Sequence, residues 1–146
     1  MIIKQLHTNQ IKTIRHQVLW SHLASSKDCV ISPDELESTF HMGAIENDIV
    51  VGTSTFLVEI NEKFDTKFQY RLRAMATSPS VKGKQVGRQI IETSIEKLKS
   101  MGVELLWCDA RLEATGFYEK LGLKMKGEIY NVPNIGPHKL MYLKIE

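Results

Sequence analysis

Cysteine is scarce in this sequence, and long apolar runs are absent. Only Cys29 and Cys108 occur among 146 residues, which is too few for a disulfide framework or a cysteine zinc site. We therefore expect reduced thiols and no metal. No apolar run is long enough to cross a bilayer, and Met1–Gln10 lacks the apolar stretch of a signal peptide. These absences favour a cytoplasmic protein with no membrane partner.

The net charge is also low, at +2. A charge of this size does not predict a nucleic-acid partner, although a locally basic segment can still bind a phosphorylated small molecule. The hydrophobic fraction of 42% and the charged fraction of 25% are typical of globular proteins. Because the chain shows no repeat, low-complexity tract or linker, we expect residues 1–146 to form one domain.

Periodicity and turn residues predict the secondary structure. Alternating or continuous apolar character predicts strands at Ile2–Leu6, Phe40–Glu46, Ile49–Ile60, Tyr70–Thr77, Val103–Cys108, Leu123–Tyr130 and His138–Ile145. Helical spacing predicts helices from Thr8, as the N-cap, to about Leu23, from Arg88 to Met101 and from Glu113 to Leu121. A short helix is expected at Ser32–Glu35, within residues 24–39, whose pattern is the least informative of the chain. Alternation along Tyr70–Thr77 predicts a strand with two different faces.

The most informative segment joins the strand Tyr70–Thr77 to the following helix. Backbone N–H groups at a helix N-terminus lack intrahelical partners, and the helix dipole favours an anion there. Gly83 and Gly87 let the loop curl around a phosphate, and nearby basic side chains add positive charge. The segment fits neither the P-loop, which ends in Gly-Lys-Ser/Thr, nor the three-glycine dinucleotide fingerprint. We expect a nucleotide pyrophosphate here, with an exposed loop whose lysines serve solubility as the alternative.

Two motifs at this spacing resemble a known family. The first is the loop Lys82-Gly83-Lys84-Gln85-Val86-Gly87, and the second is the run Ala114-Thr115-Gly116-Phe117-Tyr118-Glu119-Lys120-Leu121-Gly122-Leu123. They resemble the GNAT superfamily of N-acetyltransferases, whose loop reads Arg/Gln-x-x-Gly-x-Gly/Ala and whose later signature reads Ala-x-x-Phe-Tyr-Glu-Lys-Leu-Gly-Phe. Asp109-Ala110-Arg111 and Gly136-Pro137-His138 also resemble an ElaA-like bacterial subgroup. The resemblance implies an α+β fold with a single mixed, mainly antiparallel twisted sheet flanked by helices.

The same resemblance implies an acetyl-CoA site where the strands Tyr70–Thr77 and Val103–Cys108 splay apart. Main-chain groups of Met75, Ala76 and Thr77 would pair with the pantetheine arm. The pyrophosphate would lie at Lys82, Gly83, Lys84, Gln85, Val86, Gly87 and Arg88. Gln85 stands where the family usually has Gly, and a positive φ there would cost Gln on the order of 1 kcal/mol. Arg111 stands where many members have Asn against the cofactor, and it could contact a phosphate or pair with Asp109.

The resemblance also implies the reaction, which is acetyl transfer from acetyl-CoA to a primary amine by direct attack. Tyr118 occupies the family position for the acid that protonates the leaving thiolate, and packing in the core is its alternative role. Glu46, Glu59 and His138 are candidates for the base. Cys108 could form an acetyl-enzyme, but its apolar strand favours an inert thiol. Arg71 and Arg73 share a strand face and could hold an acidic substrate group or simply face solvent.

Two other functions remain open from the sequence. A non-catalytic acetyl-CoA sensor or scaffold could use the same fold, although a sensor has no need of the acid that Tyr118 would supply. A nucleotide-binding regulatory module would need the loop without the pantetheine cleft. The acceptor, a small-molecule or peptide amine, is not identified by the sequence, which also leaves a homodimer open.

Overall fold

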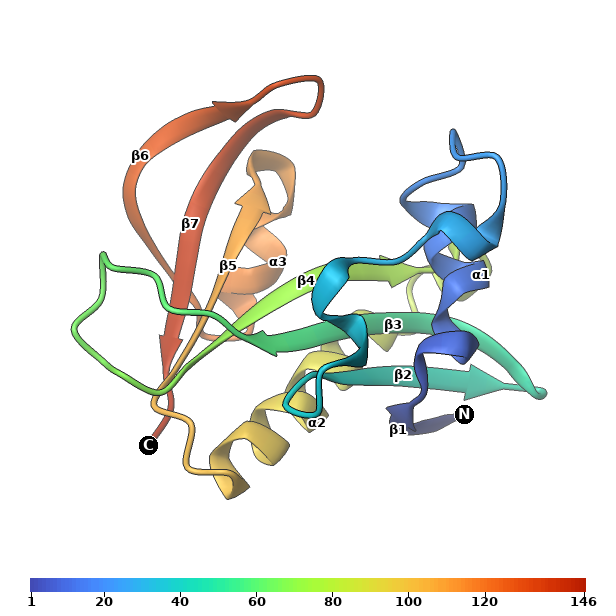
Figure 1. The fold of residues 1–146 in the computed structure, drawn as a ribbon, viewed down its shortest axis with the longest axis horizontal. Coiled ribbons are helices and arrows are strands. Elements are labelled where there is room, and N and C mark those ends of the chain that lie inside the picture. The colour runs from blue at the N-terminus through green and yellow to red at the C-terminus, as the bar shows by residue number, and fades with distance from the viewer.

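The computed structural model describes residues 1–146 and is built around one mixed sheet (Figure 1). Its strands are β1 (Ile2–Leu6), β2 (Phe40–Glu46), β3 (Ile49–Val58), β4 (Gln69–Thr77), β5 (Leu105–Arg111), β6 (Lys124–Val132) and β7 (Gly136–Lys144). Their order across the seven-stranded sheet is β1-β2-β3-β4-β5-β7-β6. Only β4 and β5 are parallel, and every other neighbouring pair is antiparallel. The mixed, mainly antiparallel sheet that the sequence predicts is therefore confirmed.

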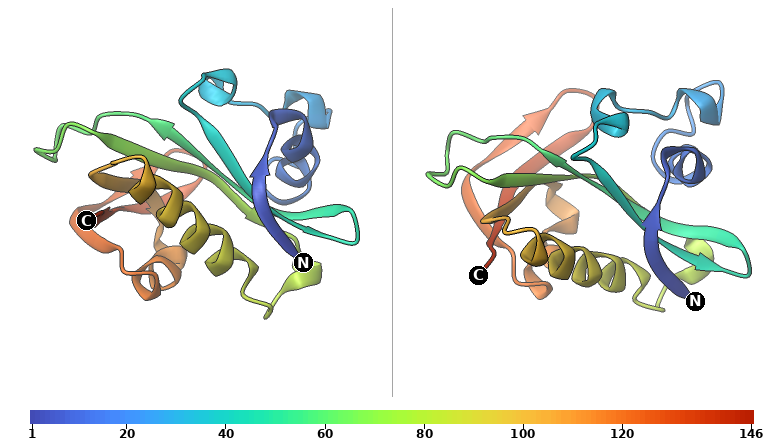
Figure 2. Two further views of the ribbon diagram at one scale, coloured as in Figure 1. Left: turned by 90° about the horizontal axis from the view of Figure 1, so that it is seen from below. Right: turned by 60° about the horizontal axis from the view of Figure 1, so that its bottom comes forward.

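Helices cover both faces of this sheet. They are α1 (Thr8–Val18), α2 (Val86–Ser100) and α3 (Thr115–Lys120), with 3₁₀ turns η1 (Ser26–Asp28), η2 (Ser32–Glu35), η3 (Pro79–Val81) and η4 (Leu112–Ala114). The two views of Figure 2 place α1 and α2 on opposite faces of the strands β2, β3 and β4. No helix combines the length and the apolar character that a bilayer crossing requires.

The apolar core is divided by the sheet into two unequal parts. On the side of α2, a large cluster includes Ile90, Ile91 and Leu98 of the helix, all 0% exposed, because the apolar stripe of α2 packs flat on the strands. On the other side, Leu105, Trp107 and Leu140 form a small cluster. This second face is therefore less filled with apolar side chains, and polar groups occupy much of it near β5.

The first helix is shorter than the sequence predicts. It ends at Val18 rather than at about Leu23, because the N–H groups of Leu19 and Trp20 both bond the Arg15 carbonyl, at 2.8 and 3.0 Å, and close the last turn. Its N-cap is His7, one residue before the expected Thr8. The Gln10 side chain accepts a hydrogen bond from the His7 N–H at 2.8 Å. The Thr8 hydroxyl instead bonds groups outside the helix.

Other boundaries move by a few residues. β3 ends at Val58, and β5 runs from Leu105 to Arg111 instead of Val103–Cys108. The expected helix over Glu113–Leu121 is split into η4 and the short α3. Asn47 and Asp48 have φ angles of 52° and 65°, the left-handed values of a tight hairpin turn. The hairpin that the sequence predicts between β2 and β3 is thus confirmed.

Candidate functional site: a cavity at the split between β4 and β5

The parallel strands β4 and β5 separate soon after they meet. Their pairing covers only Gln69–Arg71 against Leu105–Trp107. Beyond these residues a cavity of about 830 Å³ opens between the two strands. It is lined by both strands, the glycine loop, α3, the end of α1 and the β6–β7 hairpin. The strand edges that face each other here keep backbone groups free to pair with an extended ligand.

A β-bulge in β4 lies at this split. The register with β3 passes from Thr55–Arg73 to Thr53–Ala76, so Ala74 and Met75 oppose a single residue. Ala74 has a φ of 55°, which is rare for a residue with a Cβ. The regular alternation that the sequence predicts for Tyr70–Thr77 is therefore wrong from Ala74 onward. Of the residues expected along the pantetheine arm, Met75 and Thr77 line the cavity, whereas the Ala76 side chain is buried on β4.

The glycine loop and the N-terminus of α2 form one end of the cavity. Lys82, Gly83, Gln85, Val86 and Gly87 all line it. The helix begins at Val86, and its first turn carries no acidic residue, so its free N–H groups keep their preference for an anion. Gln85 has φ 57° and ψ 34°, so this position does adopt the left-handed conformation that glycine tolerates best.

Two of the predicted basic residues are turned away from the cavity. Lys84 pairs with Glu46 at 3.4 Å, and Arg88 pairs with Glu92 one helical turn later. Neither lines the cavity, so their positive charges act on an anion in the cavity only at longer range. Arg111, at the end of β5, does line it and makes no ion pair, not even with Asp109. Gly87 is closely packed, because a Cβ there would lie 3.1 Å from both Met75 Cε and Phe117 Cζ.

Tyr118 and Cys108 lie on the face of the sheet that α2 covers. Tyr118 is 7% exposed and joins the apolar cluster there, yet it also lines the cavity. Its hydroxyl is not among the enclosed side-chain atoms without a partner. Burial, with a smaller contribution from Cys108, raises the pKa of the Tyr118 phenol above its usual value of 10.0. Burial also raises the pKa of the Cys108 thiol to about 12, so this thiol stays protonated at neutral pH.

A charged network occupies the opposite face. Arg71 donates to Asp109 at 2.8 Å and to Glu59 at 3.1 Å, and its guanidinium lies 4.9 Å from the centre of the Trp107 ring. Asp109 also accepts a hydrogen bond from the Tyr130 hydroxyl. Burial, together with this hydrogen bond, raises the pKa of the Tyr130 phenol above its usual value. The network joins β4, β5 and β6 across the outer part of the cavity.

His138 is placed on the same face by the register of three strands. It pairs with Arg111 of β5 and with Tyr130 of β6, whose ring lies 6.0 Å from the imidazole. His138 Nδ1 donates to the Gly136 carbonyl at 2.9 Å, because a carbonyl oxygen can only accept. In the neutral ring, Nε2 is then the unprotonated nitrogen. His138 lines the cavity, while Glu46 and Glu59 do not, so His138 is the candidate base that the fold brings to the site.

Several residues that line this cavity are not predicted from the sequence. Those with polar groups are Trp20, which follows α1, Asp109 of β5 and Tyr130 of β6. In the sequence, Asp109 stands out only as a possible partner of Arg111 and as part of the Asp109-Ala110-Arg111 run. A signal for Tyr130 was present in principle, since an aromatic residue opposite His138 in a hairpin shares its face. Recognising it requires the register of β6 and β7, which contains an irregularity between Lys126 and Tyr130.

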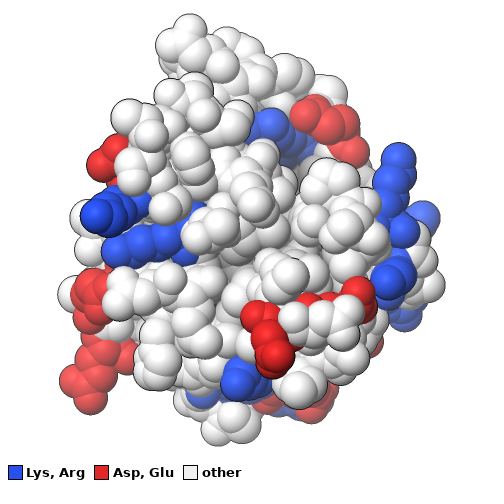
Figure 3. Space-filling view, turned by 90° about the vertical axis from the view of Figure 1, so that its right-hand side faces the viewer, with Lys and Arg blue, Asp and Glu red and all other residues white.

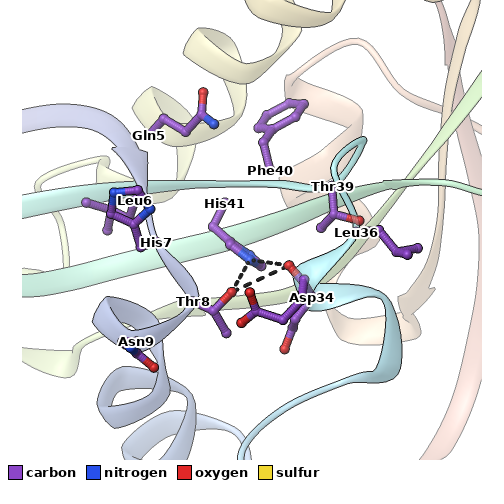
Figure 4. A pocket seen from close by; sticks show the side chains of 11 residues that line it. Gln5, Leu6, His7, Thr8, Asn9, Asp34, Leu36, Thr39, Phe40 and His41 are labelled. Carbon is purple, nitrogen blue, oxygen red and sulfur yellow. Dashed lines mark hydrogen bonds between the residues drawn. The ribbon is translucent and has the colours of Figure 1, made fainter.

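A second cavity, of about 400 Å³, lies between β1, β2 and η2 (Figure 4). Thr8, Asp34 and His41, which line it, already bond neighbouring groups. His41 Nδ1 lies 2.7 Å from the Thr55 hydroxyl, and Nε2 lies 3.2 Å from that of Thr8. Asp34 holds Arg15 through two hydrogen bonds of 2.7 and 2.8 Å. These contacts tie α1 and η2 to the sheet, and we assign this cavity a structural role.

Comparisons with known proteins agree with this geometry. The family described as "Acetyltransferase (GNAT) family" matches residues 8–123. An "Uncharacterized N-acetyltransferase YitI" of Bacillus subtilis (strain 168) is 32% identical over 140 residues, covering 96% of this chain and 93% of the relative. An aminoglycoside 6'-N-acetyltransferase solved with coenzyme A superposes with a TM-score of 0.81 at 17% identity, covering 100% and 98% of the two chains. Escherichia coli ElaA gives a TM-score of 0.76 at 18% identity, with 97% of each chain covered. The two structural likenesses establish the fold.

Proposed function

The chain belongs to the GNAT family of acetyltransferases and is an acyl-CoA-dependent N-acetyltransferase; from this we propose that it transfers acetyl to a primary amine by direct attack, with Tyr118 protonating the leaving thiolate. Acetyl-CoA is the acetyl donor. The observation that carries the proposal is that one cavity contains the split of β4 from β5, the glycine loop at the start of α2, and Tyr118. The places for the pantetheine arm and the pyrophosphate, and the proton donor, would then all lie in this one cavity.

The chain offers a binding place for each part of the donor. We propose that the pyrophosphate binds at residues 82–88, where the helix dipole and Lys82 favour negative charge. The N–H groups of Lys82 and Lys84 already bond the Pro79 and Val81 carbonyls, so the N–H groups at the start of α2 would bind the phosphate. The pantetheine arm would pair with main-chain groups of Met75, Ala76 and Thr77, which β5 leaves unpaired after Trp107. The bulge at Ala74 breaks the regular alternation of β4, and the thioester would lie beside it. We include Arg111 as a contact to the donor, because it lines the cavity and has no partner in the chain.

The two proton transfers would occur on opposite faces of the sheet. Tyr118 belongs to the α2 side, and His138 shares the other face with Tyr130 and Arg111. The amine would approach from the side of His138, whose free Nε2 accepts a proton as the nitrogen attacks. The thiolate would leave on the side of Tyr118, whose phenol is protonated at neutral pH and could pass its proton to the sulfur. Direct attack through the split thus separates the acid from the base.

The test is to incubate the protein with acetyl-CoA and a panel of primary amines. Free thiol and the mass of the amine are then followed together. We expect one thiol released for each N-acetylated amine. Acetyl-CoA binding without thiol release from any amine would instead indicate a sensor or scaffold. Nucleotide binding that excludes acetyl-CoA would indicate a regulatory module.

A further inference from the structure

We propose that the acceptor of this enzyme is an amine that carries a carboxylate, and that Arg73 binds this carboxylate. The inference rests on the proposed function, because it names the substrate class of the same site. It is carried by an arginine that lines the cavity without any partner in the chain. A primary amine and a carboxylate on one small molecule, as in an amino acid, would fit this arrangement.

Arg73 is placed in the acceptor half of the cavity by the register of the sheet. It lies opposite Thr55 on β3, and residues paired in this way share a face. The Thr55 hydroxyl accepts from Arg15 of α1 at 2.7 Å, so that face is the α1 side. Arg71, two residues earlier, shares the face and meets Asp109 there. The guanidinium of Arg73 therefore lies on the side from which the amine would approach.

The other arginines of the protein form ion pairs or, in the case of Arg111, lie at the end of β5. Arg15 pairs with Asp34, Arg71 with Glu59 and Asp109, and Arg88 with Glu92. Arg73 has no ion pair and no side-chain hydrogen bond, although it is half-buried. Its nitrogens are not among the enclosed atoms that lack a partner, so they are accessible, and the residue lines the cavity. Arg111 is likewise free, but it is exposed at the end of β5, where we place the donor.

A half-buried cation without a counter-ion is costly. Burial, together with the neighbouring Arg71 guanidinium, lowers the pKa of Arg73 below its usual value, which indicates a site that an anion would stabilise. A carboxylate is suited to this role, because a guanidinium can donate two parallel hydrogen bonds to it. Arg73 immediately precedes the bulge at Ala74, so the bound carboxylate would lie close to the reacting amine. Glu59 and Asp109 are engaged with Arg71 and are not available to Arg73 as carboxylate partners.

The experiment compares matched acceptors in the complete protein. Amino acids are assayed beside the corresponding amino alcohols and carboxamides. O-phosphoethanolamine is assayed beside ethanolamine, as the phosphate arm of the experiment, to test whether a phosphate is preferred to a carboxylate. Initial rates of thiol release and product mass give kcat/KM for each acceptor. We expect the amino acid to exceed its amino alcohol by about 10-fold or more, and Arg73→Gln to reduce this ratio to about one. Arg73→Lys should retain part of the preference, because the charge remains and the paired donors do not.

Two control variants separate this effect from others. Lys99→Gln removes the same charge from the exposed end of α2 and should leave the ratio unchanged. Arg111→Gln should weaken coenzyme A binding, measured by calorimetry, and leave the preference for the carboxylate intact. Arg73→Gln itself should keep the wild-type affinity for coenzyme A and the wild-type melting temperature. Such a variant would be folded, so that a lost preference reports on acceptor binding.

The outcomes that overturn the inference differ from those that overturn the proposed function. Acetylation of amines with and without a carboxylate at equal rates, or an unchanged ratio in Arg73→Gln, overturns the inference and leaves the function intact. A preference confined to the phosphate arm overturns the carboxylate assignment. Absence of thiol release with every amine overturns the function. Calorimetry of an amino acid with the coenzyme A complex then decides the inference, because binding that Arg73→Gln abolishes supports it, and absence of binding contradicts it.

Discussion

Two side chains, one on each face of the sheet, would carry out the two proton transfers of the reaction. Tyr118 and His138 line one cavity, with the split of β4 from β5 between them. Each has a substitution that removes the proton-handling atom and keeps most of the packing. These substitutions test the two roles independently of the fold.

Tyr118→Phe is expected to lower the turnover number by about 10- to 1000-fold, because general acid catalysis contributes in roughly this range. The ring stays in the apolar cluster, so the melting temperature and the acetyl-CoA affinity should hardly change. Single-turnover rates at saturating acetyl-CoA reveal the defect even where product release limits the steady state. Wild-type single-turnover rates would show that another group protonates the sulfur. Lost acetyl-CoA binding or a lowered melting temperature would make Tyr118 a structural residue.

His138→Asn is expected to slow acetyl transfer at neutral pH by about 100-fold or more. The Asn amide can still donate to the Gly136 carbonyl, as Nδ1 does at 2.9 Å, but it lacks the basic nitrogen. The defect should shrink as the pH approaches the pKa of the acceptor amine, because the amine then arrives already neutral. Rate profiles of the two proteins between neutral and alkaline pH provide the measurement. A ratio of rates that does not change with pH would exclude the role as a base.

The sequence identifies residues in motifs better than residues that meet through strand pairing. Tyr118 is found because it sits in a short, specific signature. His138 appears only as one of three candidates, since its selection depends on the register of β5, β7 and β6. The sequence does not indicate that Arg73 lacks an ion-pair partner. Arg71, two residues away, has similar neighbours along the chain, yet it pairs with both Glu59 and Asp109.

At the scale of elements, the loop before α2 carries backbone strain. Gln85 has a φ of 57°, where a side chain costs about 1 kcal/mol relative to glycine. We expect Gln85→Gly to be more stable than Gln85→Ala by about 1 kcal/mol, because only glycine is relieved of this cost. Chemical denaturation of both variants measures the difference. Coenzyme A affinity should stay similar, since the backbone N–H groups are unchanged. Equal stability of the two variants would contradict the claim that the backbone is strained at Gln85.

The element boundaries that the sequence misses have long-range causes. The strand at residues 70–77 reads as a regular alternation, yet pairing with Thr53 and Thr55 forces a bulge at Ala74. The first helix continues in the apolar pattern to Leu23 but ends at Val18, and the freed Trp20 lines the cavity. By contrast, α2 starts within two residues of its expected position, since its signals are local: a glycine loop and an apolar stripe.

At the scale of the whole molecule, the formal net charge is small, at +2. On the face shown in Figure 3, basic and acidic side chains are interspersed and separated by uncharged surface. Arg15 and Asp34 form a buried ion pair at 2.7 Å, and removal of one partner from a buried pair is strongly destabilising.

We expect this buried network to make the protein sensitive to acid. Burial lowers the pKa of His41 below its usual 6.5, and the charged groups facing it are Arg15 of α1 with Asp34 and Glu35 of η2. The contribution of His41 is fully present above pH 6.5. It is lost as the pH falls from that value through the lowered folded-state pKa, because the unfolded chain then binds a proton that the fold excludes.

Asp34 adds a second step at lower pH. Burial alone would raise the pKa of its carboxyl, but hydrogen bonds from Arg15 and from the Ile31 N–H outweigh burial and lower it below 3.8. Its contribution is lost as the pH falls through that lowered value. In urea titrations, His41→Gln should remove the decline in unfolding free energy just below pH 6.5 and keep the later one. An identical slope below pH 6.5 in both proteins would contradict the assignment to His41.

The most direct test of the account follows the acetyl group itself. Isotope-labelled acetyl-CoA is mixed with excess enzyme and an amine that it acetylates, and the reaction is quenched at successive times within one turnover. The account predicts that label passes from coenzyme A to the amine nitrogen with no labelled protein at any time, since the pKa of Cys108 is about 12 and its thiol remains protonated. Labelled protein that appears before the product, with acetyl on Cys108, or label that never reaches an amine, would contradict it.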